Sequence, residues 1–180
     1  MELAKVIYTN REEGSICVQY HPKNIKGGLI PELDSHSPQD GMGDFIVNKF
    51  APWHACGSDY ASYSSGMKRH SNLQFVQILV QLAPGDKDIM SAVKQWEQLF
   101  GVEHASRDEL QFTNCRVRFV EGCNEKMEGL VGIVLAVGER FDDIVEQAKK
   151  EGVWDERERC AMFLGIKWWF VKQEHIKSIL

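Results

Sequence analysis

The sequence predicts an α+β fold that contains two successive units, each with the order strand, helix and three more strands. The unit is clearest over residues 129–152, where an apolar run rich in β-branched side chains passes directly into an amphipathic helix. The same order occurs earlier, over residues 73–101. Because the pattern recurs within one short chain, we infer an internal duplication and predict paired βαβββ modules over residues 72–172.

In the later unit, Leu130–Val137 is predicted to form a buried strand. Phe141, Ile144, Val145 and Ala148 then recur at the spacing that places them on one face of a helix. Acidic residues in the first turn and lysines in the last turn favour this helix through its dipole, and a glycine follows it.

In the earlier unit, the strand is predicted over Leu73–Leu82, and Asp86 or Asp88 can cap the helix that follows it. Gly101 is expected to end that helix. The buried face of the helix is predicted to consist of Ile89, Ala92, Val93, Trp96, Leu99 and Phe100. The remaining strands of the two units are predicted at Glu103–Ser106, Glu109–Thr113, Cys115–Glu121, Arg159–Leu164 and Lys167–Lys172.

Residues 1–35 are interpreted as the terminal strands of a further, partial βαβββ module, with short strands at Glu2–Thr9, Ser15–Tyr20 and Leu29–Leu33. Pro31 favours an edge position for the last of these strands, because proline cannot donate a ladder hydrogen bond. An incomplete module leaves open strand edges, so we expect a homodimer. At the other end of the chain, residues 173–180 are predicted to be a tail.

Residues 36–71 are rich in Gly, Pro, Ser and Tyr and are too many for an ordinary loop. We interpret them either as an extended linker over the surface or as a mobile lid over a site. Within this segment His54 and Cys56 lie two residues apart. They would form a nucleophile pair only if the fold brought their side chains together.

The composition argues against several classes of partner. The formal net charge of −5 argues against nucleic acid, and no apolar run reaches the ~20 residues that a membrane span requires. The five cysteines are odd in number and include no CxxC pair, and no secretory signal is found. We therefore expect a reduced, cytoplasmic setting.

The doubled order of strand, helix and three strands resembles the vicinal oxygen chelate superfamily, which includes glyoxalases, methylmalonyl-CoA epimerases, extradiol dioxygenases and bleomycin-resistance proteins. Residues 72–172 resemble one complete glyoxalase-like domain, and the segment APGDKDIMSAVKQWEQLFGV resembles its first helix and the turn after it. Residues 21–33, HPKNIKGGLIPEL, are similar to the closing strand of an epimerase-type module. The resemblance implies that each module curls into a cup and that two cups enclose a cleft.

Metal-dependent members of this superfamily carry His or Gln on each first strand and Glu on each last strand. The four corresponding positions here are Phe75, Gly132, Arg118 and Trp169, none of which is a metal ligand. The resemblance therefore implies a metal-free domain, and we expect no cofactor. Glu32 matches a ligand position of the partial module. In the alternative, His21 and Glu32 hold a divalent metal together with groups from a second chain.

The two-residue period of strands predicts which side chains line the cleft. Val76, Ile78, Val80 and, in the later unit, Ile133, Leu135 and Val137 are expected to face the helices. The cleft lining is predicted to comprise Phe75, Gln77, Leu79, Arg116, Arg118, Gly132, Val134, Ala136 and Trp169, with Lys167 beside them. Gly132 is expected to leave room for a ligand.

This lining is apolar and aromatic with a few polar groups, which is usual for a small-molecule site. Arg118 is predicted to bind a carboxylate, a phosphate or a developing enolate, and Gln77 to hydrogen-bond a carbonyl. Both residues could instead be polar groups on a wet strand face, and Trp169 suits a wall better than a catalyst. We expect a lyase or isomerase that catalyses isomerisation, cyclisation or elimination on an oxygenated organic substrate. Two alternatives stay open: a metal-dependent lyase, epimerase or dioxygenase, and a non-catalytic binding protein of the resistance type.

Overall fold

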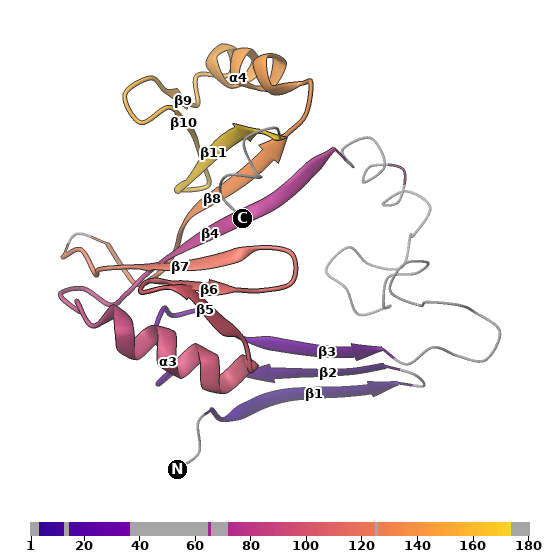
Figure 1. The fold of residues 1–180 in the computed structure, drawn as a ribbon, viewed down its shortest axis with the longest axis vertical. Coiled ribbons are helices and arrows are strands. Elements are labelled where there is room, and N and C mark those ends of the chain that lie inside the picture. The colour runs from indigo at the N-terminus through magenta and orange to yellow at the C-terminus, as the bar shows by residue number, and fades with distance from the viewer. Residues whose placement is uncertain (1–3, 13–14, 37–64, 66–71, 125, 174–180) are drawn as a thin grey trace. The chain divides into compact units, whose positions relative to one another are not determined.

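The structure, a computed structural model, describes residues 4–12, 15–36, 65, 72–124 and 126–173. The described residues form a mixed α+β fold with a large mixed sheet, a smaller antiparallel sheet and two helices of at least ten residues (Figure 1). None of the helices in this part of the chain has the length and apolar character that crossing a bilayer requires. The chain divides into two compact units, the first with residues 1–24 and 30–71, the second with residues 25–29 and 72–180.

The first unit contains a three-stranded antiparallel sheet in the order β1 (Val6–Glu12), β2 (Ser15–Tyr20) and β3 (Glu32–His36). The third strand begins later than the predicted Leu29–Leu33. Gly27 and Gly28, with φ values of 98° and 62°, form the predicted turn, and residues 29–31 after it have no regular secondary structure. Among the described strands, β3 pairs with β2 alone and is an edge strand, although Pro31, on which that prediction rested, lies just before the strand.

The second unit contains an eight-stranded sheet in the order β5-β6-β7-β4-β8-β11-β10-β9. At its centre β4 and β8 pair antiparallel, while β7 runs parallel to β4 and β11 runs parallel to β8. Each half of the sheet is thus built from a strand, a helix and three strands in chain order. The elements are β4 (Leu73–Gln81), α3 (Ile89–Phe100), β5 (Glu103–Ser106), β6 (Glu109–Gln111), β7 (Arg116–Val120), β8 (Gly129–Val137), α4 (Phe141–Lys150), β9 (Trp154–Asp155), β10 (Cys160–Phe163) and β11 (Ile166–Lys172).

The first helix of this unit, α3, begins and ends where its sequence signals lie. The Asp88 side chain accepts a hydrogen bond from the Ser91 backbone N–H, which confirms one of the two predicted caps. Gly101 ends the helix in the left-handed conformation, with φ of 64°. Ala92, Val93 and Trp96 are its buried residues, so the predicted apolar face is the packed one.

The second helix, α4, has the predicted charge pattern, with acidic residues in the first turn and lysines in the last. Arg140 precedes it and makes no capping hydrogen bond with its side chain. Gly152 follows the helix with φ of 70°, the conformation expected just beyond a helix end. Of the helix residues, Ala148 is the buried one.

Both helices cover the same face of the large sheet, as the strand register shows. Phe119 makes an edge-to-face ring contact with Trp96 of α3, with centroids 5.4 Å apart, so the β7 residues Val117 and Phe119 face that helix. Val117 lies opposite Ile78 of β4, which in turn lies opposite Ile133 of β8. Residues that are directly opposite on neighbouring strands share a face, so Ile133 is on the α3 side of the sheet.

The same face continues to α4. The Lys172 ammonium lies 5.5 Å from the ring centroid of Phe141 in α4, and Lys172 is paired with Val137 of β8. Alternation along β8 then places Ile133 and Val137 on one face. The opposite face of the sheet is therefore covered by neither α3 nor α4.

The segment 25–29 forms part of the core of the second unit. Its Lys26 carbonyl accepts a hydrogen bond from the Trp96 indole N–H, and its Lys26 ammonium forms an ion pair with Asp86 at 2.5 Å. A Cβ atom on Gly27 would lie 2.6 Å from Val80 Cγ1. Glycine is favoured there, because a Cβ atom would require Val80 to shift and the positive φ would strain any other residue.

Candidate functional site

The site predicted from the sequence maps to the sheet face that the helices leave uncovered. In one row across the sheet, Arg118 of β7 lies opposite Leu79 of β4, Leu79 opposite Gly132 of β8, and Gly132 opposite Lys167 of β11. In the next row, the order is Arg116, Gln77, Val134 and Trp169. All of the predicted cleft residues except Phe75 therefore share this face, which we call the open face.

Phe75 is placed differently because β4 carries a bulge. The pairing with β8 shifts between Phe75 and Gln77, so that Phe75 lies opposite Leu135 on the helix side of the sheet. Val76, expected to face a helix, packs instead against Ala136, Val134 and Val171. A bulge reverses the alternation beyond it, and the composition of the strand does not mark its position.

Gly132 and Trp169 pack directly against each other on the open face. A Cβ atom on Gly132 would lie 2.5 Å from Cζ3 of Trp169 and 3.4 Å from Cβ of Leu79. The indole ring of Trp169 therefore fills the space that was predicted to be available for a ligand at Gly132. The ring is held at its other end, since Trp169 Nε1 donates to the Glu158 carbonyl at 3.3 Å.

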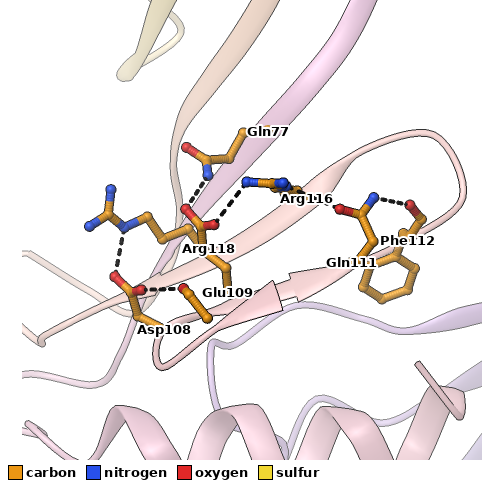
Figure 2. A network of polar contacts seen from close by, with 8 residues as sticks. Gln77, Asp108, Glu109, Gln111, Phe112, Arg116 and Arg118 are labelled. Atoms are coloured by element: carbon orange, nitrogen blue, oxygen red, sulfur yellow. Dashed lines mark hydrogen bonds and ion pairs between the residues drawn. The ribbon is translucent and has the colours of Figure 1, made fainter. Parts of the chain in front are cut away.

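A polar network lies beside this apolar surface, with Glu109 of β6 at its centre (Figure 2). Gln77 Nε2 donates to Glu109 Oε1 at 2.7 Å, and Arg116 Nη1 lies 3.4 Å from Glu109 Oε2. Arg116 Nε also donates to Gln111 Oε1 at 3.0 Å. The Arg116 and Glu109 side chains are 17% and 14% exposed, so this ion pair is largely removed from water.

Arg118 is held by a different carboxylate and is more accessible. Its Nε donates to Asp108 Oδ2 at 2.8 Å, and the Arg118 side chain is 46% exposed. Burial of the Asp108 carboxylate opposes its ionisation. Hydrogen bonds from Ser106 and Arg118 and the charge of Arg118 outweigh this effect and lower the pKa of Asp108 below its ordinary value.

Sequence reasoning missed both acidic residues, although a signal for one of them was present. The predicted strands Glu109–Thr113 and Cys115–Glu121 form a hairpin in which Glu109 lies directly opposite Arg118 and Gln111 opposite Arg116. Alternating polar residues on both strands of an antiparallel hairpin predict such cross-strand pairs. No comparable signal marked Asp108, which precedes the strand.

The alternative metal ligands His21 and Glu32 belong to the first unit, and their side chains have different hydrogen-bond partners. Glu32 accepts a hydrogen bond from the Gln19 side chain and lies close to Cys17 and Asp34, with the possible ligand atoms of these three within 4.8 Å of one another. His21 Nδ1 accepts instead from the Lys23 backbone N–H at 2.9 Å.

The Cys17 thiol in this cluster is kept in its neutral form. Burial, followed by hydrogen bonding to Asp34 and the charge of Glu32, raises the pKa of Cys17 to about 12. A neutral thiol is a hydrogen-bond donor and a poor metal ligand. The neutral thiol is suited to donating a hydrogen bond to the neighbouring carboxylates.

A cavity of about 310 Å³ lies away from the open face, where β8 leads into α4. It is lined by Val137, Gly138, Glu139, Phe141, Asp142, Lys172 and Gln173. The linker or lid predicted at 36–71, including His54 and Cys56, and the tail after Gln173 lie outside the described residues, apart from His36 and residue 65.

Comparison with known proteins found no match to this chain, either among the models of protein families or among curated proteins.

Proposed function

We propose that the second unit is a glyoxalase-like domain of two βαβββ modules and that its open face binds a small organic molecule. Two features support the domain assignment: each half of the sheet supplies a strand, a helix and three strands, and the first strands of the halves pair antiparallel at the centre. The helices on one face and the polar network on the other support the location of the site.

The proposed activity is that of a lyase or isomerase that catalyses isomerisation, cyclisation or elimination on an oxygenated organic acid. The observation that carries it is Arg118, which uses Nε for Asp108 and is otherwise accessible beside Leu79. A guanidinium edge can donate two hydrogen bonds to a carboxylate or to a developing enolate, and such donors stabilise charge most strongly beside apolar walls.

Binding of organic acids tests this proposal. We expect a screen of small oxygenated acids by ligand-observed NMR to give binders whose affinity falls about tenfold or more in Arg118→Met, because a charge-assisted hydrogen bond is lost. Arg107→Met is the matched control, since Arg107 is exposed in the turn before β6 and should leave binding unchanged. Equal affinities of the two variants for every binder would count against the proposed site.

Turnover separates the enzyme from the resistance-type binder. Each binder is incubated with the protein, and its NMR spectrum is followed for rearrangement, ring closure or loss of water. Conversion that stops in Arg118→Met supports the enzyme. Tight binding without conversion across the screen supports a protein that sequesters its ligand.

Two further points remain predictions: the absence of a cofactor, with a divalent metal held by His21 and Glu32 together with a second chain as its alternative, and a homodimer. Elemental analysis of the purified protein tests the metal, because a tight structural site would retain about one ion per chain. Sedimentation velocity tests the dimer.

A further inference from the structure

The network on the open face fixes which end of the Gln77 amide faces a ligand. An ionised carboxylate only accepts hydrogen bonds, so the part of Gln77 that contacts Glu109 must be its NH2 group. Nε2 lies 2.7 Å from Glu109 Oε1, and the other oxygen of Glu109 is engaged by Arg116. The orientation of the amide follows from chemistry, although oxygen and nitrogen have similar shapes.

The amide oxygen of Gln77 is consequently directed away from Glu109, as Figure 2 shows. Within the part of the chain that the structure describes, this oxygen has no hydrogen-bond partner. Gln77 thus offers an acceptor on the open face, whereas Arg118 offers only donors. A ligand that satisfies both must bring a donor to one and an acceptor to the other.

We propose that the site selects a hydroxylated organic acid, with its hydroxyl donating to Gln77 Oε1 and its carboxylate accepting from the Nη groups of Arg118. Glu109 is then a specificity-determining residue that acts through Gln77. This inference rests on the proposed function and narrows its substrate class. It differs from the carbonyl that the sequence alone assigned to Gln77.

The register supports one molecule reaching both groups. Gln77 and Arg118 are diagonal neighbours on β4 and β7, because Gln77 lies opposite Arg116 and Leu79 opposite Arg118. Their Cα atoms are thus roughly 8 Å apart, and two long side chains can meet over that distance. A hydroxyl on the first or second carbon from the carboxylate matches this spacing.

The remainder of the ligand would lie on apolar surface. Leu79 and Val134 adjoin the two polar residues in the same rows, and the Trp169 ring follows over Gly132. An aromatic or branched body suits this surface, since flat and apolar groups gain most from contact with an indole ring.

Three phenyl-substituted acids of similar size test the inference: mandelate with a hydroxyl, phenylglyoxylate with a carbonyl, and phenylacetate with neither. We expect the wild-type protein to bind mandelate about tenfold more tightly than phenylglyoxylate in isothermal titration, because a carbonyl would face the Gln77 oxygen without a donor. Gln77→Met should abolish this ratio and leave the affinity for phenylacetate nearly unchanged.

Glu109→Gln gives the sharper result. The new side chain carries an NH2 group as well as an oxygen, so Gln77 can turn its amide over and present a donor. We expect the preference for mandelate to fall to within about twofold or to reverse. Glu103→Gln makes the same chemical change at an exposed position on β5 and should leave the ratio unchanged.

The outcomes separate the inference from the proposed function. The inference is overturned if the acids bind less tightly to Arg118→Met but show no preference for the hydroxyl. It is also overturned if that preference does not depend on Gln77 and Glu109. In both cases the proposed site is retained. If none of the three acids binds, the assigned class is wrong, and the broader screen decides the site. Should Glu109→Gln fail to fold by circular dichroism, Gln77→Met alone carries the test.

Discussion

At the scale of single residues, Gly132 is the position where one added methyl group meets the wall of the proposed site. We predict that Gly132→Ala lowers the free energy of unfolding by about 1–3 kcal/mol, the usual cost of overpacking, because its Cβ would lie 2.5 Å from Trp169. Urea denaturation followed by tryptophan fluorescence measures this loss.

Gly138→Ala is the matched control. Its Cβ would lie 3.4 Å from the nearest atom, Gln173 Oε1, and neither glycine has a φ in the left-handed region. The two variants therefore differ in steric contact and share the change in backbone freedom. Equal losses in both would show that packing against Trp169 is not the cause.

The ion pair of Lys26 with Asp86 makes a pH-dependent contribution to stability. The hydrogen bond from Lys26 and that from the Asp88 backbone lower the pKa of Asp86, against an opposing effect of burial. A lowered pKa means that the stabilisation is present above the ordinary carboxyl value of 3.8 and is lost as the pH falls through the folded-state pKa.

We therefore predict that Asp86→Asn costs about 1.5–3 kcal/mol of unfolding free energy at pH 7, the range for a hydrogen bond to a charged group. The cost should shrink as the pH is lowered below about 4, where wild-type Asp86 begins to lose its charge in the unfolded chain. Denaturation curves of both proteins over this range measure the difference. A cost that is constant with pH would contradict the assignment.

At the scale of elements, the helices were the most predictable parts of the fold. Their apolar period, charged ends and terminal glycines all act within the segment itself, so α3 and α4 were found with their main features. The two-residue strand β9 and the bulge in β4 were not found, because both depend on the neighbouring strand. The same reason explains why Phe75 was misplaced on the open face and why Glu109 was overlooked.

The cap of α3 gives the element-scale prediction. Asp88→Ala should reduce stability by about 1 kcal/mol, because it removes the acceptor for the Ser91 N–H, whereas Asp88→Asn should retain most of it. Thermal unfolding by circular dichroism compares the two. Asp142→Ala, a charge removed from the first turn of α4 without loss of a cap, should cost only a few tenths of a kcal/mol.

At the scale of the whole molecule, the division of the chain does not follow the order of its residues. Segment 25–29 lies between two parts of the first unit in sequence and packs within the second. The sequence showed a Gly-Gly turn there and gave no sign of this packing, because the contacts with Val80 and Trp96 join distant parts of the chain.

Hydrogen exchange of the intact protein tests this division. We predict that Gly27→Ala, which places Cβ 2.6 Å from Val80, accelerates exchange in β4 and β7 and leaves β1 and β2 unchanged. Lys23→Ala is the control, since Lys23 is exposed within the first unit. Loss of protection confined to β1 and β2 would show that segment 25–29 belongs to the first unit and not to the second.

The antiparallel pairing of β4 with β8 carries a consequence for how the large sheet can be divided. Two copies of one strand related by a two-fold axis pair in this same antiparallel sense. A half-length chain that begins at β8 would expose the edge of β8 that now pairs with β4. A second copy of this half, related by a two-fold axis, could supply the missing backbone hydrogen bonds. The connection between β7 and β8 joins the two halves of the sheet in one chain. Their association is therefore intramolecular and does not depend on protein concentration.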